Sequence, residues 1–347
     1  MQLSRNAFIG NWILAATLSI APFIVSGCGG TGQPATSTIA ASAEPAVTPF
    51  VAPSPAPAPT PAPSPTPTPT PTPAPQPTPT SGIPHSSHVV LVIEENHMFT
   101  EVYPNGMPWL VAQGNTYAYS TNYHADEPGS ALDYYWLSSG SGEHVFGCQG
   151  DGCPNPITSD NIFQELNRAG LTWKVYAQSL PSVGYMGGDA GPYVDRHNPA
   201  KWYDYVIHNP AAQQKMVPFT QLAADIAANQ VPNYSLIIPD VDHDAHDGTV
   251  AQADSFLATG VAPLLNTPYF KAGGDGLLLV TFDECDGAVG ACPEQVYTAV
   301  IGPNVKRKTV SSTLYKHENT LRTMLDALGI TVYPGASSSA ADMTDFF

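Results

Sequence analysis

The chain has 347 residues, of which 43% are hydrophobic and only 12% are charged. Its 29 acidic side chains outnumber its 12 Lys and Arg side chains, and the formal net charge of −17 argues against nucleic acid or anionic surfaces as primary partners. Many of its 36 prolines fall in one tract before residue 85, so the whole chain is not one folded unit.

The first 27 residues have the parts of an export signal. Arg5 supplies a positive end, and the apolar stretch 8–25 precedes small residues. The segment "VSGC", which ends at Cys28, resembles the lipobox of bacterial lipoproteins, in which the cysteine is acylated. An ordinary signal peptide or an N-terminal membrane helix is the alternative, since the stretch is long enough to span a bilayer. We expect a signal peptide over 1–27, lipidation of Cys28, and an exported protein anchored to the cell envelope or cell surface.

Residues 28–84 alternate proline with small residues such as Ala and Thr. This composition predicts an extended polyproline II stalk, which rises by about 3.1 Å per residue. Residues 85–347 show no second break in composition and are long enough for one large domain. The sequence therefore predicts a domain held away from a membrane, with a monomer as the default oligomeric state.

Within that domain, buried strands are expected to alternate with helices. Near-continuous apolar runs predict strands at 88–94, 172–177, 234–239, 276–282 and 297–302. Helical patterns are present at 159–170, 219–230, 254–265 and 315–329; the first has Ser159 or Asp160 as its cap, and the first and last end at Gly170 and Gly329. The alternation predicts a three-layer α/β/α sandwich with a mostly parallel central sheet, in which ligands bind at the carboxyl ends of the strands.

Three of the predicted strand ends carry metal-binding side chains. Glu95 and Asn96 follow the first strand, the stretch "PDVDHDAHDG" at 239–248 follows the third, and Asp283 and Glu284 follow the fourth. Each group alone is compatible with a solvated turn. Together at one edge of a sheet they would repel unless a cation lay between them, so we expect a divalent metal site.

The acidic stretch also resembles the opening of an EF-hand calcium loop, but that interpretation fails. Ala245 stands where the loop needs glycine, and Ala251 stands where it needs glutamate. Asp242 and His246 are four residues apart, so on a helical turn they would share one face. An Asp and His pair suits zinc, manganese or iron.

A candidate nucleophile lies between the first two strands. Ser130 follows Pro128 and Gly129 and opens a predicted helix at 131–137, where the helix N-terminus favours an anion. A metal could lower the pKa of its hydroxyl and make it a nucleophile. The alternative is that Ser130 only caps the helix.

Four further cysteines fall in two close pairs, Cys148 with Cys153 and Cys285 with Cys292. In an exported chain this pattern predicts two short-loop disulfides. A zinc ribbon is disfavoured because the spacings are not C-x-x-C and no adjacent His completes a ligand set.

Seven segments, in order along residues 88–330, resemble the bacterial phosphoesterase family of acid phosphatases and phospholipases C within the alkaline phosphatase superfamily. They are "VIEENHMF", "NYHADEPGSALDYYWLSSGS", "GLTWKVYAQSLP", "RHNPAKWY", "YSLIIPDVDHDAHDG", "LLLVTFDE" and "YKHENTLRTMLDALGI". The resemblance implies an alkaline-phosphatase-like fold, a phosphate-ester substrate and one or two divalent metal ions, among which zinc, manganese, iron, calcium and magnesium stay open.

The resemblance also implies residue roles. Ser130 takes the place of the nucleophile, and His197 that of a phosphate contact. His246 and His317 take places where they would bind a second metal or, with one metal, contact phosphate and donate a proton. The implied metal ligands are Glu95, Asn96, Asp242, His246, Asp283, Glu284 and His317.

Two positions depart from the family pattern. Asp133 replaces the usual asparagine and adds negative charge where phosphate must bind, although a protonated Asp133 would act as a donor at acid pH. Gly129 replaces the usual proline. The chain length and the "ENHMFT" motif favour an acid phosphatase over a phospholipase C-type phosphodiesterase. A catalytically inactive ligand-binding lipoprotein is the alternative from another class.

Overall fold

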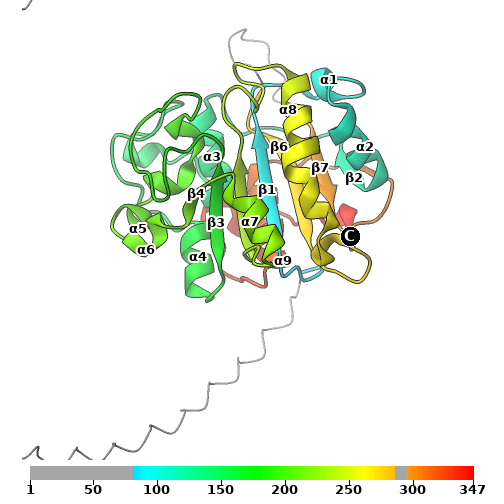
Figure 1. Ribbon diagram of the computed structural model, residues 1–347. Helices are drawn as coiled ribbons and strands as arrows, with labels where there is room; N and C mark the ends of the chain where they lie inside the picture. The colour runs from blue at the N-terminus through cyan, green and yellow to red at the C-terminus, as the bar shows by residue number, and fades with distance from the viewer. Residues whose placement is uncertain (1–80, 286–294) are drawn as a thin grey trace, which may run out of the picture. The chain divides into compact units, whose positions relative to one another are not determined.

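The computed structural model describes residues 81–285 and 295–347. Within these ranges one sheet has eight strands in the order β4-β3-β5-β1-β6-β7-β2-β8 (Figure 1). The strands are β1 (Val89–Glu94), β2 (Ala118–Ser120), β3 (Trp173–Ala177), β4 (Met216–Pro218), β5 (Tyr234–Ile238), β6 (Leu277–Phe282), β7 (Thr298–Ile301) and β8 (Thr309–Ser311).

The first strand in the sequence lies at the centre of the sheet. β1 pairs in parallel with β5 on one side and β6 on the other, and Val89 is in register with Tyr234 and Leu277. Every residue of β1, β5 and β6 is buried, as expected for a sheet covered on both faces. Only β7 among the described strands runs against its neighbours. The residues that follow β1, β5 and β6 therefore meet at one edge.

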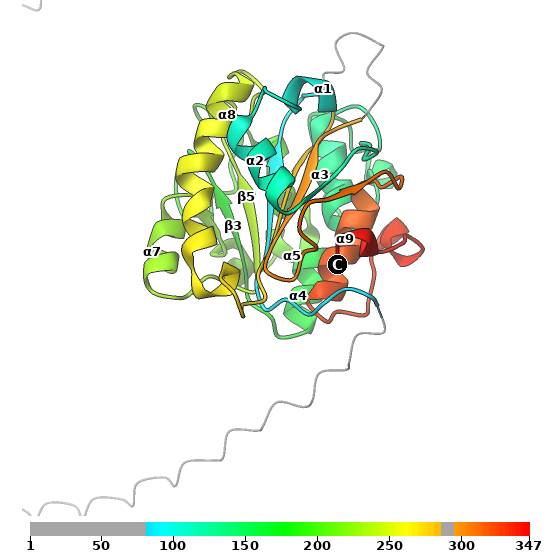
Figure 2. The same ribbon diagram turned by 90° about the vertical axis from the view of Figure 1, so that its right-hand side faces the viewer.

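Helices cover both faces of this sheet. Figure 2 shows α7 and α8 on one face and α3, α4 and α9 on the other. The helices are α1 (Phe99–Val102), α2 (Pro108–Thr116), α3 (Ser130–Ser139), α4 (Ile162–Arg168), α5 (Asp204–Ile207), α6 (Pro210–Gln213), α7 (Gln221–Ala227), α8 (Val250–Phe256) and α9 (His317–Ala327). The predicted three-layer α/β/α sandwich with a mostly parallel sheet is confirmed.

All five predicted strands are present. The sequence did not predict β2, β4 or β8, each of which has three residues. Three residues are too few to show a run or an alternation of apolar side chains, so these strands depend on pairing with neighbours that are distant in sequence.

Two helix ends differ from the prediction. The cap of α4 is Asn161, whose side chain accepts a hydrogen bond from the Gln164 amide, rather than Ser159 or Asp160. The helix α8 begins at Val250, where Thr249 and Gln252 form a capping box, and is followed by π and 3₁₀ turns over 257–266. Gly170 and Gly329 have the left-handed backbone expected of helix stops, with φ of 71° and 72°.

No helix in the described part of the chain is long and apolar enough to cross a membrane. The predicted signal segment 1–27, Cys28 and nearly all of the predicted stalk lie outside the described residues.

Candidate active site

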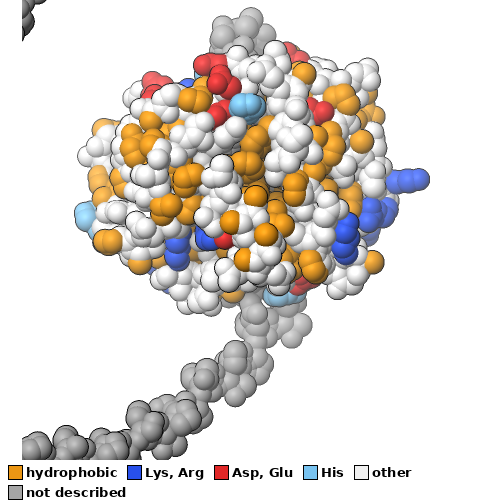
Figure 3. All heavy atoms as spheres, in the orientation of Figure 1, with side chains coloured by type: hydrophobic (Ala, Val, Ile, Leu, Met, Phe, Trp, Pro, Cys, Tyr) orange, Lys and Arg blue, Asp and Glu red, His pale blue; other side chains and the backbone are white. Residues whose placement is uncertain are grey.

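Three carboxylates meet at the edge where the central strands end. Glu95 follows β1, Asp244 lies in the turns after β5, and Asp283 follows β6; all three are fully buried. The Glu95 amide donates to the Asp244 carbonyl, and the Asp283 amide donates to the Glu94 carbonyl, so backbone hydrogen bonds join the three strand ends. Other acidic side chains, exposed at the surface, lie at the upper edge of the molecule in Figure 3, the end towards which β1 runs in Figure 1.

The candidate nucleophile points at this cluster. Ser130 is the first residue of α3 and is 7% exposed, and its Oγ donates a 3.0 Å hydrogen bond to Glu95 Oε2. The N-cap of α3 is Gly129, with φ of 115°, so Ser130 does not cap the helix. The hydroxyl faces a carboxylate at the positive end of a ten-residue helix.

His197 lies between two of the carboxylates. Its Nε2 is 3.2 Å from Glu95 Oε1, and its Nδ1 is 3.2 Å from Asp244 Oδ2. The Tyr134 ring stacks on its imidazole at a centroid distance of 5.3 Å and an angle of 8°. These contacts hold the imidazole inside the cluster. Burial lowers the pKa of His197 well below its usual value and so favours the neutral ring.

Two further predicted residues are tied to the same edge. The Asn96 amide donates to Asp283 Oδ1 at 3.1 Å. The Gly129 amide donates to Glu284 Oε2 at 2.8 Å, which joins the end of β6 to the start of α3. Glu95, Asn96, Ser130, Asp283 and Glu284 are thus brought to one site, as the sequence predicted.

Burial controls the protonation of these acids. It raises the pKa of Glu95 well above its usual value, with Asp283 and Asp244 contributing as nearby negative charges. It raises the pKa of Asp244 to about 7 and that of Asp283 to about 6. In the absence of a cation, the folded protein therefore disfavours the state in which Glu95, Asp244 and Asp283 are all ionised.

The donor set fits a divalent cation. Glu95 Oε1 and Asp283 Oδ2 are buried and have no hydrogen-bond partner among the described residues. Ligand atoms of Glu95, His197 and Asp244 lie within 4.8 Å of one another. Because converging buried carboxylates with unsatisfied oxygens are costly without a counter-charge, these groups have the chemistry of a cation site.

The structure corrects the expected role of Asp242. The Asp244 amide donates to the Asp240 carbonyl as in one helical turn, but Ala245 has a left-handed φ of 77° and the His246 amide donates to the Asp244 side chain, so the turn does not continue from Asp242 to His246. The i, i+4 geometry is therefore absent, Asp242 is exposed, and Asp244 takes the buried position beside Glu95. Sequence reasoning missed Asp244 because four acids stand in one short stretch and only the fold decides which of them turns inward.

His317 is buried outside the pocket and contacts the backbone of Asp283. Its Nε2 is 2.6 Å from the Asp283 carbonyl oxygen, which can only accept, so Nε2 carries the hydrogen. Its Nδ1 then accepts from the Tyr123 hydroxyl at 3.0 Å. His317 is fully buried and does not line the pocket, and burial lowers its pKa to about 4. In this arrangement the His317 imidazole positions Asp283. Ligand atoms of His317, Asp126 and Asp133 also lie within 4.8 Å of one another, so the predicted metal-binding role of His317 stays a prediction.

Asp133 is also buried behind the site. Its Oδ1 accepts from the Asp126 amide at 3.0 Å and lies 3.4 Å from His317 Nε2. Burial raises its pKa well above the usual value. Asp133 does not line the pocket, so the expected direct substrate contact is not supported by the geometry.

A pocket of about 650 Å³ opens over Ser130. His246 lines it, and its Nε2 is 3.2 Å from an Arg196 guanidinium nitrogen. Arg196 is the only Lys or Arg among the described residues that line the pocket, and the sequence analysis did not assign it a role. The sequence feature that could have indicated Arg196 is its position directly before His197, the expected phosphate contact.

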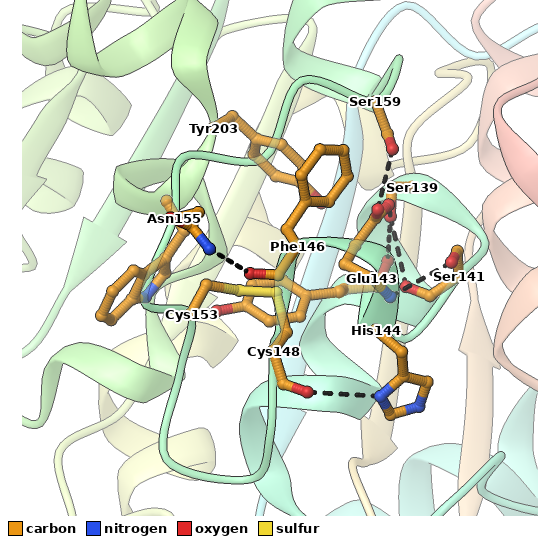
Figure 4. Close-up of a disulfide and its surroundings, with 12 residues drawn as sticks. Ser139, Ser141, Glu143, His144, Phe146, Cys148, Cys153, Asn155, Ser159 and Tyr203 are labelled. Atoms are coloured by element: carbon orange, nitrogen blue, oxygen red, sulfur yellow. Dashed lines mark hydrogen bonds between the residues drawn. A yellow bond between two sulfur atoms is a disulfide. The ribbon is translucent and has the colours of Figure 1, made fainter.

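One of the predicted disulfides is confirmed. Cys148 and Cys153 are bonded, and the loop they close lies beside α3 (Figure 4). The second predicted pair includes Cys292, which lies outside the described residues.

The fold is similar to that of a solved protein from the alkaline phosphatase superfamily. A solved protein of this superfamily from Vibrio parahaemolyticus matches with a TM-score of 0.50 at 11% identity, over 73% of this chain and 69% of that one. At this identity the likeness concerns the fold alone.

Sequence comparison gives the family. The Phosphoesterase family pattern matches residues 101–331. The phosphatidylinositol-3-phosphatase of Mycobacterium tuberculosis is 29% identical over 269 residues, which cover 77% of this chain and 85% of that protein. An acid phosphatase of Aspergillus fumigatus is also 29% identical, over 61% of this chain but only 47% of its own length. The chain belongs to the Phosphoesterase family and is a phosphoric ester hydrolase.

If the cluster holds a cation, added Mn²⁺, Ca²⁺, Mg²⁺ or Zn²⁺ will stabilise the chelator-treated protein by mass action. The free energy of unfolding rises by about 2.7 kcal/mol at a cation concentration 100 times the dissociation constant, and the melting temperature rises with it. We expect Glu95→Gln to abolish this increase, because Glu95 lies at the centre of the cluster. Asp242→Asn, the exposed control, should retain it. Equal increases in both variants, measured by thermal denaturation, would contradict the site.

The raised pKa of Asp244 also predicts a pH dependence of stability. A carboxyl group with a folded pKa of about 7 and an unfolded value near 4 binds more protons in the folded state across that window. Its contribution to the free energy of unfolding is present below pH 4 and is lost as the pH rises to 7, by up to about 1.4 kcal/mol per pH unit.

Urea denaturation in chelator from pH 4 to 7 should show a steeper loss in the unmodified protein than in Asp244→Asn, in which the raised pKa values of Glu95 and Asp283 still contribute. Parallel pH curves for the two proteins would show that Asp244 is not the responsible group.

Proposed function

We propose that this protein is an acid phosphatase-like phosphomonoesterase that requires a divalent cation and acts through a phosphoseryl intermediate on Ser130. The observation that carries the proposal is the 3.0 Å hydrogen bond from the Ser130 hydroxyl to Glu95 in a pocket at the N-terminus of α3. The family membership and the acid phosphatase relatives support the same reaction class.

In the first half of the proposed reaction, Ser130 Oγ attacks phosphorus as the bond from phosphorus to the alcohol oxygen breaks. The hydroxyl proton passes to Glu95, which already accepts its hydrogen bond and whose pKa is raised by burial. We assign to His246, which lines the pocket, the proton that the departing alcohol oxygen receives. In the second half, water attacks phosphorus and gives a proton to His246, which lost one in the first half. The bond from phosphorus to Ser130 Oγ breaks, Oγ takes its proton back from Glu95, and phosphate leaves.

The proposed cation ligands are Glu95, Asn96, Asp283 and Glu284, with Asp244 and His197 adjoining them. When bound there, a divalent cation would lower the pKa of the serine hydroxyl and neutralise charge on the phosphate. His197, held between Glu95 and Asp244, would keep these carboxylates in place. The positive end of α3 favours the phosphate anion at Ser130.

We also propose that the protein is exported and tethered. This proposal is supported by the "VSGC" segment at Cys28 and by the proline-rich tract that separates it from the catalytic domain.

The main test is an assay of the purified protein with p-nitrophenyl phosphate and bis-p-nitrophenyl phosphate from acid to alkaline pH. We expect turnover of the monoester that a chelator removes and a divalent cation restores. Ser130→Ala should reduce kcat by at least about 1,000-fold, because it removes the attacking atom. Preference for the diester would favour a phospholipase C-type reaction, and no turnover under any condition would favour a ligand-binding role.

Arg196 provides a separate prediction about substrate binding. It is the cationic side chain on the pocket wall, so Arg196→Gln should raise the KM for p-nitrophenyl phosphate by roughly 10- to 100-fold, the effect of losing one charged hydrogen bond. Lys271→Gln removes an exposed cation outside the pocket and serves as the control. Equal KM values for the two variants would remove Arg196 from the site.

A further inference from the structure

The loop closed by the Cys148–Cys153 disulfide is a compact ring of backbone. The cysteines are five residues apart, and both are buried. Inside the ring, Gln149 and Gly152 exchange two backbone hydrogen bonds, of 2.9 and 3.0 Å. The disulfide and this bridge together leave the intervening residues little conformational freedom.

The segment that leads into the ring is fastened to the C-terminal end of α3. Glu143 accepts hydrogen bonds from Ser139, the last residue of α3, at 2.6 Å and from Ser159 at 2.7 Å (Figure 4). His144 Nδ1 donates to the Cys148 carbonyl at 3.2 Å. The chain therefore returns along α3 from its last turn to its first.

At the first turn the ring touches the residues on both sides of the candidate nucleophile. The Ala131 amide, an early helix donor, donates a 3.1 Å hydrogen bond to the Gly150 carbonyl. Gly150 also packs on Gly129, so closely that a Cβ on Gly150 would lie 3.0 Å from the Gly129 Cα atom. Because the N-cap Gly129 has no side chain, the Gly150 carbonyl supplies a helix-capping acceptor from another segment.

The same ring forms part of the pocket wall. Gly150 and Asp151 line the pocket together with Ser130. The ring thus contacts the backbone that carries the hydroxyl and the space in which a substrate would bind.

We propose that the loop 148–153, closed by its disulfide, is a positioning element for Ser130. It fixes the first turn of α3 so that the Ser130 hydroxyl meets Glu95, and this role rests on the proposed function of Ser130 as the nucleophile. A disulfide that closes so short a loop belongs to the weaker end of disulfide stabilisation, so its main effect is expected on catalysis and not on global stability.

The sharpest test is Gly150→Ala. Gly150 is not among the residues with a positive φ, so alanine is compatible with its own backbone, but the new methyl group must displace Gly129. Gly188→Ala is the matched control, since Gly188 is exposed, has no positive φ and would place its Cβ in open space.

With p-nitrophenyl phosphate, Gly150→Ala should lower kcat by about 10- to 100-fold, the usual cost of a small displacement of reacting groups. Its KM and melting temperature should stay close to those of Gly188→Ala. The double variant Cys148→Ser, Cys153→Ser should lower kcat in the same direction, and it decides the question if Gly150→Ala does not fold.

Ser130→Ala in the same assay separates the two proposals. If Ser130→Ala is inactive while the Gly150 and cysteine variants keep full kcat, the positioning role is overturned and the nucleophile stands. If Ser130→Ala keeps full turnover, both proposals fall. If the variants lose stability in proportion to activity, the loop is only structural and the inference is again overturned.

Discussion

The site depends on one electrostatic constraint, the burial of three carboxylates at the end of a parallel sheet. Glu95, Asp244 and Asp283 follow three adjacent strands, and backbone hydrogen bonds join the ends of these strands. Burial makes the ionised forms of these groups unfavourable, and unsatisfied carboxylate oxygens remain. A bound cation would relieve both costs at once, because it would supply the counter-charge and occupy the unsatisfied oxygens.

The histidines around this cluster occupy two different kinds of position. His197 and His317 are fully buried, with ring nitrogens directed at carboxylates or a carbonyl, whereas His246 lines the pocket beside Arg196. Burial lowers the pKa of the first two, so they act as neutral spacers in the metal-free protein. Of these three histidines only His246 lines the pocket, while His197 and His317 hold neighbouring groups in place.

Sequence alone predicted the sheet and much of the site because both depend on local patterns. Long apolar runs showed the five principal strands, and the acids directly after β1 and β6 could only lie at the strand ends. Asp242 was chosen over Asp244 because a helical turn was assumed where a left-handed Ala245 bends the chain. The contact of Gly150 with Gly129 was beyond sequence reasoning, because nothing local indicates which glycines will touch.

The backbone at Gly129 has a consequence for comparison with relatives. Proline, which the family resemblance leads us to expect at this position, is fixed near a φ of −65°, whereas Gly129 has a φ of 115°. A relative with proline there must enter the corresponding helix by another path, even where the aligned residues on either side are the same. A template with proline at this position would therefore not reproduce the path by which this chain enters α3, or the close approach of Gly150 to Gly129.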